Sequence, residues 1–220
     1  MKEIDLTTWS RKAHYECFSA YTNPIFSLCT RLDVTDLVHY SKQTATSYFA
    51  NFLFIAIKCL NHTEGFTRRI LPDGRVVEYE VCDPSYIVMN DEGVIVTCRN
   101  KMRFDYQGFY ADVRSAVEKA KKQTKKEKFN DDDQGVALFY TSCLPWVDFT
   151  SMSNPYDLKN PAQSSIPRLT WGKFVQKGER YEMAMDIAAH HALLDGQHLA
   201  EGFNKIQTAL NDVQSFFNKG

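Results

Sequence analysis

The fold is governed by one short segment, Tyr181-Glu182-Met183-Ala184-Met185-Asp186-Ile187-Ala188-Ala189-His190-His191-Ala192-Leu193-Leu194-Asp195-Gly196. In its first half large apolar side chains occupy every second position, which is the period of a half-buried β-strand. Residues 168–175 also have a strand pattern, and Lys177-Gly178-Glu179 supplies a turn, so the two strands are expected to form a hairpin. Beyond Gly196, apolar residues recur every three or four positions from Leu199 to Phe217, which predicts one amphipathic helix.

Outward from this segment, the strand and helix patterns are mixed without a regular βαβ alternation. That mixture predicts an α+β fold around a sheet of mixed direction. Ser10 is the expected N-cap of the first helix, and Asp83-Pro84 is expected to break the strand pattern. Strands are expected at 4–6, 26–34, 66–71, 76–81, 86–89, 94–98 and 136–143, and helices at 11–20, 44–61 and 108–128.

Length and composition indicate one domain, residues 1–220, with enough apolar residues for a sizeable core. The 44% hydrophobic content excludes disorder for most of the chain, and the net charge of −1 gives no field that would recruit nucleic acid or a membrane surface. The basic run at 121–128 is expected to be a solvated helix end. Residues 1–5 lack the pattern of a signal peptide, and no segment is long enough to cross a bilayer, so a soluble protein is expected.

The six cysteines are scattered and include no C-x-x-C pair. Metal and redox sites usually show short paired spacings, so these cysteines are expected to be reduced apolar fillers. A reduced interior favours a cytoplasmic location. A zinc site at the two adjacent histidines is not expected, because neighbouring residues on a strand point to opposite faces.

The candidate for chemistry is the motif His190-His191-x-x-x-Asp195-Gly196, placed where a strand gives way to a helix. A lone histidine on such a strand would more often be a packed core residue. The doublet followed by aspartate and glycine at fixed positions favours a catalytic function instead. A neutral imidazole can remove a proton from a hydroxyl near pH 7, so a general base is predicted here.

This motif resembles the active-site signature of the chloramphenicol acetyltransferase family. It is more distantly similar to the acyltransferase cores of 2-oxo acid dehydrogenase complexes and to peptide-synthetase condensation domains. Three further segments resemble the first family in the same order, and the similarity runs from about residue 5 to 217. They are Trp9-x-Arg11-Lys12-x-His14-Tyr15, Ser142-x-x-Pro145-Trp146-Val147-x-Phe149 and Thr170-x-x-Lys173-Phe174.

The resemblance implies a two-layer α/β sandwich with helices on one face of the sheet, assembled as a homotrimer with active sites between subunits. Acetyl-CoA, as co-substrate, and an alcohol would enter a tunnel from opposite ends. By the same resemblance, His191 would be the general base and Ser142 would stabilise the oxyanion. Thr170 would hold a water near the intermediate.

The resemblance also assigns supporting residues. Asp195 and Arg11 would form a structural ion pair. The acceptor pocket would include Phe18 and Val96, although Val96 stands where the family carries a phenylalanine. Lys173 and Phe174 would face the adenine end of CoA, and no metal is implied.

The expected function is therefore an acetyl-CoA-dependent O-acetyltransferase that modifies chloramphenicol by direct attack within a ternary complex. No nucleic acid or membrane partner is expected. Two alternatives stay open, since residues 23–28 depart from the usual acceptor segment. One is an acyltransferase for another hydroxyl-bearing xenobiotic or metabolite, and the other is a catalytically silent trimeric homologue.

Overall fold

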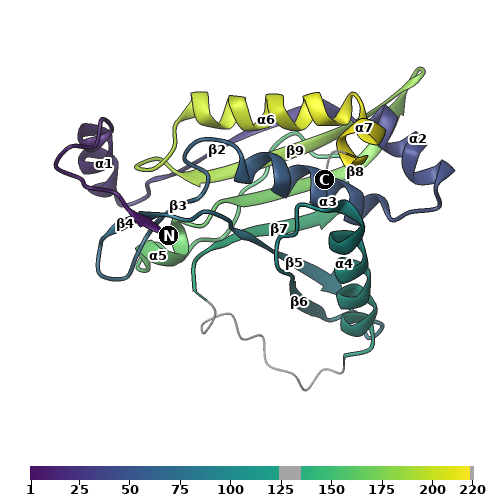
Figure 1. Ribbon diagram of the computed structural model, residues 1–220, viewed down its shortest axis with the longest axis horizontal. Helices are drawn as coiled ribbons and strands as arrows, with labels where there is room; N and C mark the ends of the chain where they lie inside the picture. Colours follow the sequence, from purple (N-terminus) through teal and green to yellow (C-terminus); the bar gives the residue numbers. More distant parts are fainter. Residues whose placement is uncertain (124–134, 219–220) are drawn as a thin grey trace.

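The computed structural model describes residues 1–123 and 135–218, and its main layer is a six-stranded mixed sheet (Figure 1). The strand order is β2-β9-β8-β7-β5-β6. β7 runs parallel to both β5 and β8, and the other neighbouring pairs are antiparallel. The strands are β2 (Ile25–Asp33), β5 (Asp83–Met89), β6 (Ile95–Arg99), β7 (Leu138–Leu144), β8 (Arg168–Lys177) and β9 (Arg180–His190).

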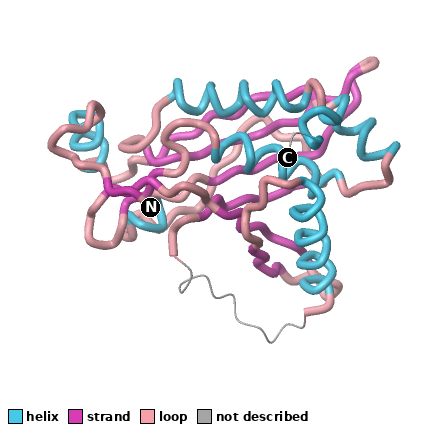
Figure 2. Tube along the Cα trace, in the orientation of Figure 1, coloured by secondary structure: helices cyan, strands magenta, loops and turns pink. Residues whose placement is uncertain are grey.

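The longer helices form the second layer and lie across one face of this sheet (Figure 2). The predicted α+β class and the mixed sheet are confirmed. A small second sheet, with the order β1-β4-β3, was not anticipated as a separate unit. The remaining elements are β1 (Lys2–Glu3), β3 (Arg68–Ile70), β4 (Val76–Glu78), α1 (Lys12–Ser19), α2 (Thr35–Gln43), α3 (Tyr48–Asn61), α4 (Tyr106–Lys121), α5 (Pro161–Ser164), α6 (Gly196–Leu210) and α7 (Val213–Asn218).

The core lies between the helices and the inner face of the sheet. Met183, Met185 and Ile187 on β9 are fully buried there, as the alternating pattern predicts. α3 is the central helix of this layer, because it is buried on nearly its whole circumference. Its N-cap is Ser47, whose hydroxyl accepts a hydrogen bond from the Ala50 amide.

Several predicted boundaries are wrong. The C-terminal helix is two helices: α6 ends at Leu210, and α7 starts anew because the Asp36 carboxylate accepts a hydrogen bond from the Val213 amide at 2.8 Å. Ser10 is not a cap, since α1 follows Arg11 without any side-chain cap. The first strand lies at Lys2–Glu3 rather than at 4–6.

Two further expectations concern the middle of the chain. The strand pattern is interrupted before Asp83, as expected, but Asp83 and Pro84 themselves begin β5, because proline is tolerated at a strand start. α4 runs from Tyr106 to Lys121, two residues earlier at its start than predicted. Most of the basic run at 121–128 lies outside the described residues.

One buried cation joins the small sheet to the main sheet. The Arg69 side chain on β3 is fully buried and donates hydrogen bonds to four backbone carbonyls, those of Phe66, Arg68, Val136 and Leu138. Leu138 begins β7, so the guanidinium links the two sheets through carbonyls that have no water to bond instead.

Replacing Arg69→Met should lower the free energy of unfolding by about 3–5 kcal/mol, because it leaves several buried carbonyls without donors. Urea unfolding followed by circular dichroism measures the change. Arg75→Met is the matched control, since that side chain is half exposed and solvent screens its ion pairs. Equal unfolding midpoints for the two variants would contradict the assignment.

Candidate active site

The histidine doublet lies in a tight turn between β9 and α6. The His190 carbonyl accepts hydrogen bonds from the Leu193 amide at 3.0 Å and the Leu194 amide at 3.1 Å. The His191 amide donates to the Pro24 carbonyl at 2.8 Å, which fixes the turn to the start of β2. The backbone on both sides of His191 is therefore held by the sheet.

Two aromatic rings position the His191 imidazole. Its centroid lies 3.8 Å from that of Phe18, with the rings nearly parallel at 3°, and 4.3 Å from that of Phe26 at 27°. Its Nδ1 is buried and has no hydrogen-bond partner among the described residues. Stacking rather than hydrogen bonding therefore sets the ring plane, and Phe18, predicted for the acceptor pocket, contacts the predicted base directly.

His190 has a structural position. Its side chain is 4% exposed, and its Nδ1 accepts a hydrogen bond from the Ala192 amide at 3.3 Å. Burial, together with the neighbouring His191, lowers the pKa of His190 to about 4. It is therefore neutral at physiological pH.

Asp195 organises the entrance to α6. Its carboxylate accepts from Arg11 Nη1 at 2.6 Å and lies 2.7 Å from His198 Nδ1, and it caps the helix through the amides of Gln197 and His198. Although burial by itself would raise the pKa of this carboxyl, the hydrogen bonds from Arg11 and His198 hold it well below its usual range. The predicted Arg11–Asp195 pair is present in the structure at that distance.

Ser142 and Thr170 lie side by side on the outer face of the sheet, the face away from the helices. The strand register pairs Ser142 with Thr170 and Thr170 with Asp186. The Thr170 hydroxyl is buried and has no hydrogen-bond partner in the described chain. Both carboxylate oxygens of Asp186 are likewise buried and without a partner among the described residues. Asp186 was not anticipated as a site residue, because a charged residue at an alternating strand position is usually solvated.

Burial raises the pKa of Asp186 to about 6, and the nearby Ser27 hydroxyl lowers this pKa by a smaller amount. Because the folded pKa is above the ordinary value of 3.8, the wild type should lose stability as the pH rises from about 4 through 6.

Asp186→Asn should therefore raise the free energy of unfolding above pH 6 by about 2–3 kcal/mol and have little effect below pH 4. Urea unfolding at several pH values measures this. Asp157→Asn, in an exposed turn, is the control that should show no such pH-dependent difference. A constant gain or loss at all pH values for the Asp186 variant would contradict the titration.

Ser142 lies between two cavities. The first, about 730 Å³, is largely apolar; its lining includes Tyr48, Phe49, Trp146 and Phe174. The second, about 320 Å³, is more polar; its lining includes Thr97, Tyr140, Asn154 and Arg168. Ser142 is the predicted site residue that lines both.

The other predicted residues fall around these cavities. Phe174 contacts Tyr48 at a centroid distance of 4.8 Å, and the adjacent Lys173 is exposed. Val96 packs against the core and lines neither cavity, whereas its neighbour Thr97 lines the second.

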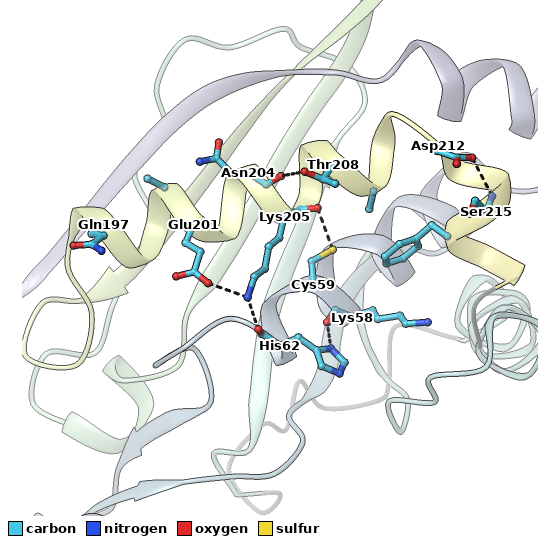
Figure 3. Close-up of a pocket in the computed structure, with 13 residues that line it drawn as sticks. Lys58, Cys59, His62, Gln197, Glu201, Asn204, Lys205, Thr208, Asp212 and Ser215 are labelled. Atoms are coloured by element: carbon cyan, nitrogen blue, oxygen red, sulfur yellow. Dashed lines mark hydrogen bonds and ion pairs between the residues drawn. The ribbon is translucent and has the colours of Figure 1, made fainter.

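A third cavity contains none of the predicted catalytic residues. It is a groove of about 900 Å³ between α3, α6 and α7 (Figure 3). In it, Lys205 Nζ donates to the His62 carbonyl at 2.6 Å and pairs with Glu201 at 2.9 Å, and the buried Cys59 thiol donates to the Lys205 carbonyl. These polar groups are occupied with one another, so volume alone does not locate the chemistry.

His191 lines neither of the two cavities beside Ser142. Across β8, Ser142 on β7 is in register with Asp186 on β9, two strands away. Asp186 precedes His190 by four residues on β9. A rise of about 3.3 Å per residue and a spacing of about 4.8 Å between strands put the Ser142 and His190 Cα atoms about 16 Å apart. His191 follows beyond the strand end.

No described helix is long and apolar enough to cross a membrane. No cluster of three or more His, Cys, Asp or Glu side chains suited to a metal ion occurs at 1–123 or 135–218.

The architecture is shared with solved acyltransferases. A chloramphenicol acetyltransferase structure superposes with a TM-score of 0.83 at 24% identity, covering 95% of this chain and 99% of that one. The dihydrolipoamide acetyltransferase of Azotobacter vinelandii superposes with a TM-score of 0.66 at 16% identity, over 93% of this chain and 88% of that one.

Sequence comparison gives the family. The chloramphenicol acetyltransferase family model matches residues 1–207. The chloramphenicol acetyltransferase of Staphylococcus aureus is 28% identical over 210 residues, covering 93% of each chain, and that of Proteus mirabilis is 26% identical over 204 residues, covering 93% of this chain and 92% of its own. The chain belongs to the chloramphenicol acetyltransferase family, as the resemblance predicted, and this membership supports acetyltransferase activity.

Proposed function

We propose that this chain transfers the acetyl group of acetyl-CoA to a hydroxyl of chloramphenicol, with residues 1–220 as a single acetyltransferase domain. The observation that carries the proposal is the position of Ser142 between an apolar and a polar cavity. Two reactants approaching from the two cavities would meet at its hydroxyl. Holding both reactants there replaces a bimolecular encounter with a local one.

The apolar cavity suits the slender pantetheine arm of acetyl-CoA. Aromatic side chains of Tyr48, Phe49 and Phe174 surround it, and Trp146 is 68% exposed at its rim. The exposed Lys173 lies next to Phe174 in sequence and is the cation we assign to the nucleotide end. The chain therefore offers an apolar channel with a basic group near it, as a CoA ester requires.

The proposed mechanism is a direct transfer. His191 removes the proton of the acceptor hydroxyl, and the oxygen attacks the thioester carbonyl. The Ser142 hydroxyl donates a hydrogen bond to the oxyanion that develops, and a water held by Thr170 lies near the intermediate. Collapse breaks the C–S bond, and the proton taken by His191 passes to the CoA sulfur. No acetyl-enzyme forms.

We infer that the active site is completed between copies of the chain, as in a homotrimer. In one chain the Ser142 and His190 backbones are about 16 Å apart on the sheet geometry, so His191 is better placed to serve a neighbour's Ser142. Large apolar side chains are exposed near Ser142, a composition that favours contact with a second copy. They are Ile87, Met89, Ile95, Trp146 and Val147.

The cellular location follows from the thiols. All six cysteines are free, including the exposed Cys17. We therefore assign the protein to the reducing cytoplasm.

Replacing His191→Gln should lower kcat for chloramphenicol acetylation about 10²–10⁴-fold, because the hydroxyl loses its base. Release of the CoA thiol, followed with a thiol reagent, measures the rate. The melting temperature should stay close to that of the wild type, since the buried His191 Nδ1 has no hydrogen-bond partner among the residues that the structure describes. Near-normal turnover would refute the assignment.

Ser142→Ala should lower kcat about 10²-fold, the usual effect of removing one oxyanion donor. KM for acetyl-CoA should change little, because the interaction strengthens only as charge develops. Ser164→Ala, a buried serine on α5 that lines neither cavity, is the control. A loss below about threefold for the Ser142 variant would argue that this hydroxyl is only structural.

A second acceptor class is favoured by one observation, the polarity of the smaller cavity. Another hydroxyl-bearing compound would then replace chloramphenicol. A catalytically silent homologue would instead release no thiol with any acceptor tested.

A further inference from the structure

Arg168 lines the smaller cavity together with Ser142. Its guanidinium carbon lies 4.1 Å from the ring centroid of Tyr156 and 5.4 Å from that of Tyr140. The guanidinium forms no ion pair or hydrogen bond with any residue that the structure describes, and its Nε is buried. The half-buried Arg168 cation next to the proposed reaction centre thus contacts two tyrosine rings but no carboxylate of the described chain.

The rings hold this cation in place. The Tyr140 hydroxyl donates to Gln163 Oε1 at 2.8 Å, and Arg168 is paired across the sheet with Tyr140 and Ala188. Contacts with aromatic faces fix the plane of a guanidinium without using its N–H groups. The donors of Arg168 are therefore positioned before any ligand arrives.

Other donors face the same cavity without partners. The Thr97 hydroxyl on β6 and the Asn154 Nδ2 amide in the loop before α5 are buried and form no hydrogen bond in the described chain. Unpaired buried donors are costly, so the cavity is built to receive hydrogen-bond acceptors. Asp186 does not fill this role, since its carboxylate oxygens lack partners too and it does not line the cavity.

We propose that this cavity anchors a planar two-oxygen group of the acceptor molecule, a nitro or a carboxylate group, and that Arg168 is the residue that selects for it. The inference rests on the proposed function, because it places the acceptor in the cavity that shares Ser142. A guanidinium presents two parallel N–H groups whose spacing matches two such oxygens. Thr97 and Asn154 would donate to the same or neighbouring oxygens.

The two candidate groups, nitro and carboxylate, differ in charge. Chloramphenicol carries a neutral aryl nitro group, whereas a carboxylate would also gain from the positive charge. We therefore expect the carboxylate analogue to be bound at least as tightly as chloramphenicol. An analogue with hydrogen in place of the nitro group should be bound more weakly than either compound.

The experiment compares these three acceptors in the wild type, Arg168→Met and Arg168→Lys by thiol release. The wild type should prefer the nitro or carboxylate compound over the hydrogen analogue about 10–100-fold in kcat/KM, the value of charge-assisted hydrogen bonds. Arg168→Met should abolish that preference with KM for acetyl-CoA unchanged. Arg168→Lys should keep part of the carboxylate preference only, because lysine keeps the charge without the fork. An undiminished preference in Arg168→Met overturns the inference.

Controls separate the remaining outcomes. Arg180→Met, at the exposed start of β9, should leave every ratio unchanged. If Arg168→Met fails to fold, Asn154→Leu should still reduce the preference several-fold. Light scattering tests whether Arg168 pairs with another copy instead: loss of the oligomer in Arg168→Met, with an unchanged preference, would overturn the inference.

Failure of the proposed function is distinguishable from failure of this inference. A wild type that releases no thiol with any of the three acceptors refutes the acetyl transfer. The carboxylate analogue alone should still raise the melting temperature of the wild type, and not that of Arg168→Met, if the cavity is an anchoring site. Equal shifts in both proteins would refute the anchoring site itself.

Discussion

The hydrogen bonds of the Asp195 carboxylate connect the parts that the site needs. This one side chain caps α6, pairs with Arg11 before α1 and contacts His198. Because α6 begins directly after the His190-His191 turn, the same contacts set where β9 ends and where the histidines lie. A charge-assisted network in a half-buried place is strong enough to fix such a junction. The chemistry therefore depends on a group that touches no reactant in the proposed mechanism.

The sequence predicted what periodicity and motif spacing encode. The alternation at Tyr181–Ile187 gave the hairpin strand, and the mixture of patterns gave the α+β class, both confirmed. The break between α6 and α7 was missed because it depends on Asp36, which is far away in the chain. The Asp36 carboxylate accepts a hydrogen bond from the Val213 amide. Local patterns carry no information about such distant partners. The resemblance named Ser142 and Arg11, whereas Arg168 and Asp186 emerged only when the register placed them.

The cavities also show why size is a poor guide to function. The groove between α3, α6 and α7 is larger than either cavity beside Ser142, yet Lys205 in it already bonds to Glu201 and to the His62 carbonyl (Figure 3). The smaller cavity beside Ser142 instead has buried donors, on Thr97 and Asn154, that no residue described by the structure satisfies. Unsatisfied hydrogen-bonding capacity in a concave place is the stronger sign of a ligand site, because its energetic cost needs a compensating interaction.

The stacking of Phe18 on His191 has a practical consequence for anyone handling this protein. α1 contributes no buried residue, yet it supplies one of the two rings that clamp the imidazole. A bulky fusion tag at the amino end could therefore displace that ring while the main core stays intact. Such a preparation would be folded by circular dichroism and thermal unfolding and still be inactive. The position of the affinity tag should therefore be varied when activity is measured.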